Sequence, residues 1–459
     1  MGITNKISQY REFRRGVVHC TFNPDGPGVV RIHLVPPRPR LFGQDAYIVI
    51  LNGYYILPIG YSWALILSRF MNEVNGHDGY EISEEDCERI VAATVKAVKR
   101  VYPFTSRDEI REDLSEIMRV LFAVARGDDP EAEIERLSIR AYADSMTAPH
   151  RMDLMVSAMT DGEGRWRCNQ KCAFCYAAGQ SKSASRELTT DEWRRAIDIL
   201  GEARVPMLTF TGGEPTLRED LPELVCYAKR FVTRLNTNGV ALTPELAREL
   251  RLAGLDSVQI TLYSHNADVH NSLVGVARFA DTVSGIRAAL AAGLDVSVNT
   301  PLCRANADYS GTLEFLHGLG VRFVTASGLI CTGMACSAHE SADLTRDELF
   351  EAIRVAKDYC DGVGMELDFT SPGLIDADRL ESLGMRVPMC GAALSNMAIA
   401  PDGEVVPCQS WLTADAGLGN ILTEKFTKIW NHERAVTLRS MSEDEALVCP
   451  FRREEHKDE

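Results

Sequence analysis

The stretch RWRCNQKCAFCYAAGQ, residues 165–180, holds Cys168, Cys172 and Cys175 in a C-x3-C-x2-C run. It follows DLMVSAM (153–159), the first of several short apolar runs that predict β-strands. Three thiolates at this spacing can bind three corners of an iron–sulfur cluster and leave the fourth iron open to another ligand. A zinc knuckle is the alternative, but zinc normally takes four ligands, and no histidine or fourth cysteine stands nearby in the sequence.

The region from about residue 150 to residue 365 alternates apolar runs with amphipathic stretches. Six such runs are followed by segments that often begin on threonine and end on glycine, as capped helices do. This alternation predicts parallel β-α-β units. Six units predict an α/β fold, a partial (β/α)6 barrel of the TIM type, with the cysteine run at the carboxyl ends of the strands, where barrel enzymes carry their chemistry.

The flanking regions differ from the barrel. Residues 1–145 begin with strand-like runs and continue with helical patterns, for which Ser83 and Ser106 are predicted N-caps, so we expect an N-terminal α+β domain. Residues 366–459 contain MAIAPDGEVVPCQSW, which predicts strand, turn and strand in a small C-terminal domain.

Composition narrows the class of protein. The chain has 459 residues, more than the roughly 250–300 that one core usually serves, and a formal charge of −16, which argues against a nucleic-acid partner. The opening residues are polar, without the apolar core of a signal peptide, and the most apolar stretch, residues 47–70, is interrupted by glycines and a proline. We expect a cytoplasmic protein without a membrane partner, in which clustered cysteines bind metal.

The motif C-x3-C-x-aromatic-C, here CNQKCAFC, resembles the signature of the radical S-adenosylmethionine (radical SAM) enzymes over residues 150–365. The resemblance implies a [4Fe–4S] cluster on the three cysteines, with S-adenosylmethionine at its open iron. It also implies an electron donor of the flavodoxin or ferredoxin type. Reductive cleavage would give a 5′-deoxyadenosyl radical that takes a hydrogen atom from a substrate. Phe174 would pack near the cluster and adenosine, and backbone groups at Tyr176 would meet the adenine.

Other strand ends fit the same resemblance. In TFTGGEPT, glycines allow a ligand to approach the backbone closely, and the resemblance implies that Gly212, Gly213 and Glu214 hold the methionyl amine. Polar side chains at the next strand ends would contact the ribose and carboxylate. Each of these could instead be a capping or turn residue: Asn238, Gln259, Ser264 and Asn299.

Further cysteines follow the predicted barrel. Cys390 and Cys408 bracket the predicted hairpin and Cys449 follows it, which resembles the auxiliary-cluster domains called SPASM or twitch. Further cysteines needed for two clusters are absent, so we predict one auxiliary cluster on these three, with buried or zinc-binding cysteines as the alternative. Cys331 and Cys336, just past the sixth strand, are catalytic candidates that could return or remove a hydrogen atom; ligation of the second cluster or loop packing are alternatives.

The substrate is less well specified by the sequence. The N-terminal region is weakly similar to the winged-helix peptide-recognition domain found before many SPASM-type enzymes, which implies a ribosomally made precursor peptide as partner and substrate. A radical SAM enzyme of small-molecule or cofactor biosynthesis is the alternative. A non-catalytic iron–sulfur electron carrier or redox sensor is the alternative from another class, and the GGE motif argues against it.

Overall fold

A computed structural model describes residues 17–22, 30–36, 47–77, 82–143, 146–161, 163–336 and 342–450. The chain forms two compact units. The first comprises residues 1–150 with 200–207 and 230–232, and the second comprises the remainder. Within the described ranges, no helix has both the length and the apolar character needed to span a membrane.

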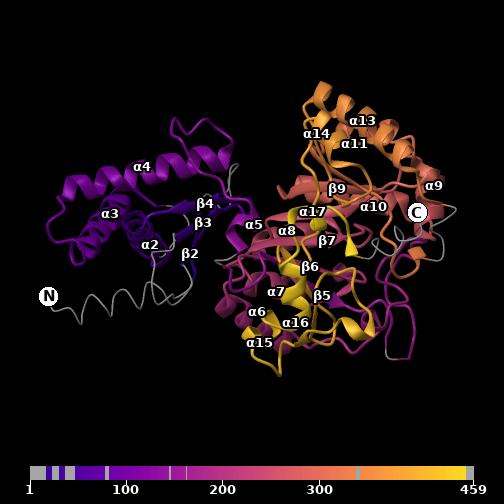
Figure 1. Ribbon diagram of the computed structural model, residues 1–459, viewed down its shortest axis with the longest axis horizontal. Helices are drawn as coiled ribbons and strands as arrows, with labels where there is room; N and C mark the ends of the chain where they lie inside the picture. The colour runs from indigo at the N-terminus through magenta and orange to yellow at the C-terminus, as the bar shows by residue number, and fades with distance from the viewer. Residues whose placement is uncertain are drawn as a thin grey trace. The chain divides into compact units, whose positions relative to one another are not determined.

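The first unit is built on an antiparallel sheet of four strands in chain order (Figure 1). Its strands are β1 (Val18–Phe22), β2 (Val30–Val35), β3 (Tyr47–Leu51) and β4 (Tyr55–Ile59). Between β3 and β4 the Tyr54 amide donates to the Leu51 carbonyl (2.9 Å), and Asn52 and Gly53 both have positive φ. Asn-Gly is the pair that such a tight hairpin turn favours, because both central residues must enter the left-handed region.

Helices complete the core of this unit. They are α2 (Tyr61–Asn75), α3 (Glu84–Lys99), α4 (Arg107–Arg126) and the short α5 (Ile139–Tyr142). The Ser83 hydroxyl accepts from the Asp86 amide, and Ser106 forms a reciprocal capping box with Glu109, so both predicted N-caps are confirmed. Apolar residues of the sheet and of α2, α3 and α4 form one buried cluster.

The second unit contains a ten-stranded sheet in the order β11-β10-β9-β8-β7-β6-β5-β12-β13-β14 (Figure 1). The six predicted strands are present, and the α/β class with a parallel sheet is confirmed. They are β5 (Arg151–Ser157), β6 (Met207–Gly212), β7 (Val232–Thr237), β8 (Ser257–Thr261), β9 (Asp295–Pro301) and β10 (Phe323–Ser327). The helices between and after them are α6 (Thr190–Ala203), α7 (Leu221–Tyr227), α8 (Pro244–Ala253), α9 (Ala267–Val274), α10 (Phe279–Ala291), α11 (Ser310–Gly318) and α13 (Arg346–Val363).

Not every strand was predicted, since β1, β11 and the two-residue β14 (Gly419–Asn420) lie outside the predicted strands. β11 (Glu366–Phe369) pairs in parallel with β10 at the edge of the sheet, where the sequence analysis had placed a change of region. Its four residues, ELDF, are too few to show a periodic pattern, so only pairing with a formed neighbour identifies them as a strand.

The sheet curves, and its concave face is polar. Gln259 Nε2 on β8 donates to Thr325 Oγ1 on β10 (3.0 Å), and Arg234 Nη2 on β7 reaches Ser297 Oγ on β9 (3.4 Å). Each contact spans an intervening strand, a backbone separation of roughly 9–10 Å, which these side chains bridge on a concave face. The alternate residues are apolar and fully buried, as expected where helices cover the outer face: Leu235, Val258, Val298 and Val324.

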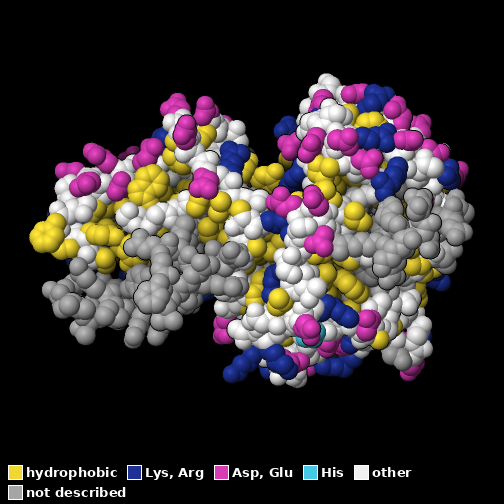
Figure 2. All heavy atoms as spheres, viewed as in Figure 1, with side chains coloured by type: hydrophobic (Ala, Val, Ile, Leu, Met, Phe, Trp, Pro, Cys, Tyr) yellow, Lys and Arg dark blue, Asp and Glu magenta, His cyan; other side chains and the backbone are white. Residues whose placement is uncertain are grey.

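The C-terminal part continues the same sheet. β12 (Asn396–Ile399) runs parallel to β5, β13 (Glu404–Val406) returns antiparallel, and β14 (Gly419–Asn420) follows, which confirms the predicted strand, turn and strand. The short helices here are α14 (Ala377–Ser382), α15 (Phe426–Trp430), α16 (Glu433–Arg439) and α17 (Glu443–Ala446). Figure 2 shows mixed basic and acidic side chains over α13 and α14, where ion pairs such as Arg379 with Asp347 lie in solvent.

Candidate active site

The cysteine run lies in a loop that follows β5. Asp161 Oδ1 accepts from the amides of Glu163 and Arg165, and Trp166 Nε1 donates to the Gln170 carbonyl (2.7 Å). Within the run, the Cys175 amide donates to the Cys172 carbonyl (3.2 Å). Local hydrogen bonds therefore fix the path of the chain on both sides of Cys168.

Helix α9 supports the far side of this loop. The amides of Lys171 and Ala173 donate to the carbonyls of Val274 and Leu273, each at 2.9 Å. Gly275 follows α9 with φ +69° and lies against the backbone of Lys171. A Cβ at this position would stand 2.7 Å from the Lys171 carbonyl oxygen. The sequence analysis missed this glycine, for which a C-terminal helix position was the only signal.

The three thiols are partly buried and influence one another. Burial raises the pKa of Cys168 to about 12 and raises the pKa of Cys172 and of Cys175. Charge on Cys168 and Cys175 also raises the pKa of Cys172, which places the three sulfurs in one electrostatic neighbourhood. A metal bound by these thiolates would have to offset this cost of deprotonation.

We also considered whether side chains in the described residues could bind a single metal ion. Among the residues that the structure describes, no three His, Cys, Asp or Glu side chains converge tightly enough to hold one metal ion. In a four-iron cluster each cysteine binds a different iron, so its ligands stand farther apart than those of a single ion. The donor set of three neighbouring thiols after β5 fits such a cluster chemically.

The GGE turn after β6 packs directly against the end of β5. The Gly213 amide donates to the Ser157 carbonyl (2.9 Å), and the Glu214 amide donates to Ser157 Oγ (3.1 Å). A Cβ on Gly212 would stand 2.4 Å from the Ser157 carbonyl oxygen, and one on Gly213 would stand 2.6 Å from the Ala158 carbonyl oxygen. Both positions therefore require glycine, which brings the Gly213 carbonyl to 3.5 Å from Cys168 Sγ.

The Glu214 side chain is 2% exposed and organises the ends of two strands. Its Oε1 accepts from the Thr216 amide (3.0 Å), from Thr216 Oγ1 (2.5 Å) and from Thr237 Oγ1 (2.6 Å), while Oε2 accepts from the Asn238 amide (2.8 Å). Burial raises the pKa of Glu214, and these hydrogen bonds oppose that shift. Because Oε2 has a single donor, it keeps capacity for a further one, such as an ammonium group.

Asn238, at the end of β7, joins the cysteine loop to this turn. Its Nδ2 donates to Asn169 Oδ1 (2.6 Å) and lies 3.9 Å from Cys168 Sγ. The structure thus brings together Cys168, Gly213, Glu214 and Asn238, as the sequence analysis expected for this part of the site. Asn169 was not predicted, because nothing marks the second residue of the cysteine motif as a partner of a distant strand.

The remaining predicted cofactor contacts lie at two levels. Gln259 and Asn299 both bond to Thr325 on the concave face, where Thr325 Oγ1 donates to Asn299 Oδ1 (2.9 Å). Ser264 is buried, and its hydroxyl accepts from the Asn266 amide (3.1 Å) just before α9, so it has a turn-forming role whatever else it binds. Thr325 was missed, since a threonine within a strand gives no functional signal.

The aromatic residues of the motif occupy different surroundings. Phe174, like Cys172, packs against a buried apolar cluster that includes Tyr263 and Leu329. The Tyr176 carbonyl accepts from Gln180 Nε2 (2.5 Å) and from Thr332 Oγ1 (3.3 Å), so the loop after β10 meets the cysteine loop here.

The other predicted cysteines form two groups. Burial raises the pKa of Cys408 to about 12, and charge on Cys390 and Cys449 adds to this shift, so these thiols lie near enough to influence Cys408. The Cys390 amide also donates to the Ala446 carbonyl (2.6 Å), which ties the hairpin to the end of the described chain. Separately, the sulfurs of Cys331 and Cys336 lie 3.5 Å apart in the loop after β10.

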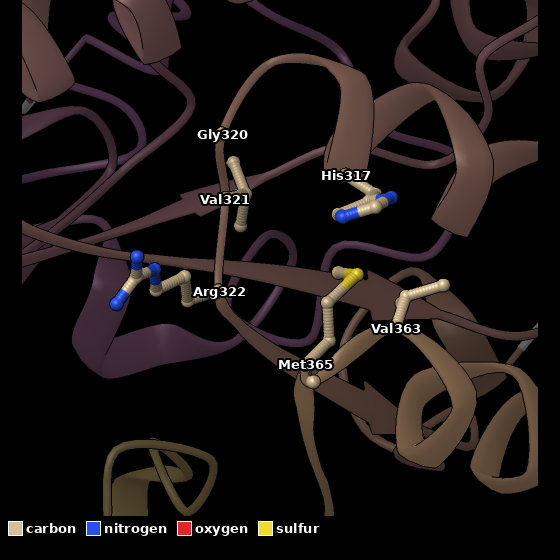
Figure 3. A pocket seen from close by; sticks show the side chains of 7 residues that line it. His317, Gly320, Val321, Arg322, Val363 and Met365 are labelled. Atoms are coloured by element: carbon tan, nitrogen blue, oxygen red, sulfur yellow. The ribbon is translucent and has the colours of Figure 1, made fainter.

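A cavity of about 480 Å³ lies near the amino ends of β10 and β11, the ends opposite those that carry the cysteine run. It is lined at the amino ends of β10 and β11 by residues that include His317, Arg322 and Met365, and Figure 3 shows His317 and Met365 facing one another. The cysteine run and the GGE turn lie at the carboxyl ends of the strands, so this cavity is no part of their site.

Two known families match parts of the chain. Residues 167–316 match the radical SAM superfamily, and residues 390–451 match an iron–sulfur cluster-binding domain, SPASM. The superfamily implies a [4Fe–4S] cluster with S-adenosylmethionine, and the second domain implies further iron–sulfur chemistry.

Individual relatives fall into two groups. The PqqA peptide cyclase of Streptomyces rochei is 29% identical over 303 residues, 63% of this chain and 80% of that protein. The AdoMet-dependent heme synthase of Oleidesulfovibrio alaskensis is 28% identical over 281 residues, 57% of this chain and 71% of that protein. Among solved structures, Streptococcus suis SuiB bound to the precursor peptide SuiA superimposes with a TM-score of 0.57 at 14% identity, covering 86% of this chain and 88% of SuiB.

Proposed function

We propose that this chain, which belongs to the radical SAM superfamily and carries a C-terminal iron–sulfur cluster-binding domain, modifies a ribosomally made precursor peptide. As a radical SAM enzyme it uses S-adenosylmethionine and a reduced cluster to generate the radical that takes a hydrogen atom from its substrate. The division into an N-terminal domain (1–145), a barrel (150–365) and an auxiliary-cluster domain (366–459) is part of this proposal.

The residues of the site have separable tasks in this proposal. Cys168, Cys172 and Cys175 hold the cluster, and the GGE turn presents Glu214 Oε2 to the methionyl amine. Asn238, through Asn169, fixes the loop against the strand ends. Gln259 and Asn299 offer polar groups on the concave face, and Cys390, Cys408 and Cys449 hold an auxiliary cluster.

The observation that favours a peptide is the separate N-terminal unit. It has its own core and an antiparallel sheet in which, among the described residues, no strand pairs with the outer edge of β1, although the His19 carbonyl on β1 accepts from Asn75 Nδ2 (2.6 Å). The other edge is different, because the Leu137 amide donates to the Ile56 carbonyl of β4 (2.9 Å). An extended peptide can add to an open strand edge through main-chain hydrogen bonds, and the relatives that act on or bind precursor peptides support this use.

A second candidate is a small-molecule reaction, favoured by the heme synthase relatives.

Both candidates need an external one-electron donor, for which we propose a flavodoxin or ferredoxin. We propose the reducing cytoplasm as the chain's compartment, because the cysteines of the described residues form no disulfide.

The test uses the full chain with its clusters reconstituted without oxygen. Reduced enzyme and S-adenosylmethionine are incubated with a synthetic precursor peptide encoded beside the gene, and 5′-deoxyadenosine and peptide mass are measured. We expect 5′-deoxyadenosine together with a changed peptide mass, and slower hydrogen exchange in residues 18–22 when the peptide is bound. Formation of 5′-deoxyadenosine with an unmodified, unbound peptide would reject the peptide and favour the small-molecule reaction.

A further inference from the structure

Three charged side chains meet on the concave face of the sheet, toward the amino ends of the strands. Arg151 Nε donates to Asp153 Oδ1 (2.8 Å) and its Nη2 to Asp153 Oδ2 (3.2 Å), so these neighbours on β5 form a two-pronged ion pair. Arg234 on β7 lies near both, since its pKa is lowered to about 10 by burial and then by Arg151, with Asp153 opposing. Its Nη2 donates to the hydroxyl of Ser297 (3.4 Å).

The charges of this group do not balance. Arg151 already occupies both oxygens of Asp153, which is fully buried. Within the described part of the chain, no carboxylate lies within ion-pair distance of Arg234, and Asp295 on β9, two strands away, is instead influenced by Arg251. Two guanidinium groups and one carboxylate leave one positive charge uncompensated by protein groups; both arginines are half-buried, so solvent screens part of its cost.

Polar atoms around this charge also lack partners in the protein. Arg234 Nε, Asn236 Oδ1 and Thr209 Oγ1 are buried and make no hydrogen bond to any described residue. Asn236 stands two residues beyond Arg234 on β7, on the same face, and Thr209 is 1% exposed on β6. Buried polar groups are usually satisfied, so donors and an acceptor left open beside a surplus cation point to a ligand.

We propose that this group, defined by Arg151, Asp153 and Arg234, binds a carboxylate of the substrate and thereby selects an acidic substrate. The inference rests on the proposed function, because it assigns the substrate to the concave face. A guanidinium presents parallel N–H donors that match a carboxylate, so Arg234 supplies the charge and orientation. The carboxylate belongs to an acidic side chain or to a chain terminus.

The group lies at a different depth from Asn238, a predicted cofactor contact, but near the level of Gln259, which is in register with Asn236 and Ser297. Arg234 precedes Asn238 by four residues along β7, about 13 Å at the usual rise per residue. Asn238 contacts the cysteine loop, so Arg234 lies toward the amino ends of the strands. A substrate held there would extend upward to the predicted radical chemistry.

The experiment uses the reconstituted holoenzyme with S-adenosylmethionine and small carboxylate probes. N-acetyl-glutamate N-methylamide represents an acidic side chain, N-acetylglycine represents a chain terminus, and N-acetyl-glutamine N-methylamide is the uncharged control. Binding is measured by calorimetry for the wild type, for Arg234→Gln and for Arg354→Gln, a matched control on the exposed face of α13.

We expect one acidic probe to bind and the glutamine probe not to bind. Arg234→Gln should weaken that binding by about tenfold or more, the loss of a charge-assisted pair. Iron content and affinity for S-adenosylmethionine should not change, and the melting temperature should stay equal or rise, because a surplus buried charge is removed. Arg354→Gln should leave probe binding at the wild-type value.

Other outcomes overturn the proposal. Unchanged probe binding in Arg234→Gln, or a fall in melting temperature without an effect on the probe, would make Arg234 structural. Lost affinity for S-adenosylmethionine would assign it to the cofactor. If Arg234→Gln does not fold, Arg234→Lys keeps the charge but lacks the parallel N–H donors of a guanidinium. It should still lower the affinity for the acidic probe. The probes require no peptide, so failure of the peptide function would not alter their result.

Discussion

Replacement of Glu214 by glutamine tests whether this buried carboxylate serves S-adenosylmethionine as well as the fold. Oε1 has three donors and Oε2 has one, so the amide oxygen of glutamine must take the Oε1 position. The amide nitrogen then faces the Asn238 N–H, donor against donor. One hydrogen bond is lost, a buried donor is left open, and the other three bonds lose their charge.

The magnitude follows from these contacts. An unsatisfied buried donor costs about 1–3 kcal/mol, and charged hydrogen bonds exceed neutral ones by about 1 kcal/mol each. Removal of a buried charge offsets part of this, so we expect a net destabilisation of about 2–4 kcal/mol. Loss of an ammonium partner at Oε2 should weaken S-adenosylmethionine binding by at least about tenfold.

The assay pairs differential scanning calorimetry with equilibrium binding of S-adenosylmethionine to reconstituted protein. Thr216→Val is the matched control, because it removes one donor to Oε1 and leaves the charge and Oε2 intact. We expect it to lower the melting temperature slightly at nearly wild-type affinity. A Glu214→Gln protein that loses stability but binds S-adenosylmethionine like the wild type would refute a ligand role.

Three other perturbations test separate parts of the chain. Combined replacement of Cys168, Cys172 and Cys175 by alanine should remove about four irons per chain, measured by iron analysis, and abolish 5′-deoxyadenosine formation; retained formation would contradict the cluster assignment. Cys408→Ala should preserve uncoupled 5′-deoxyadenosine formation but lower iron content and stop product formation, whereas loss of zinc with iron unchanged would identify a zinc site. His33 has its pKa lowered to about 3 by burial and then by the charges of His19, Arg31 and His150. Between pH 6.5 and pH 3, His33 is therefore protonated in the unfolded chain and neutral in the folded chain. The free energy of unfolding should fall as pH drops through this range, by up to about 1.4 kcal/mol per pH unit. His33→Gln should reduce this slope in acid-unfolding curves. An unchanged slope would place the acid sensitivity elsewhere.

Patterns within short segments determined much of the fold and part of the site. The alternation of apolar strands and capped helices predicted the parallel sheet, and Ser83 and Ser106 cap helices as expected. The cysteine motif and the GGE turn were identified because their spacing itself carries the chemistry. Such features depend on residues a few positions apart, whose geometry the local backbone fixes.

The tertiary structure decided which distant residues meet. Glu214 receives its hydrogen bonds from the ends of two strands, and Asn169 pairs with Asn238 across 69 residues of sequence. No sequence period encodes the curvature that lets Arg234 reach Ser297 across a strand, nor the register that leaves β11 at the sheet edge. Strand order, register and curvature set these contacts, and they arise only when the whole sheet forms, because each depends on neighbours far away in the chain.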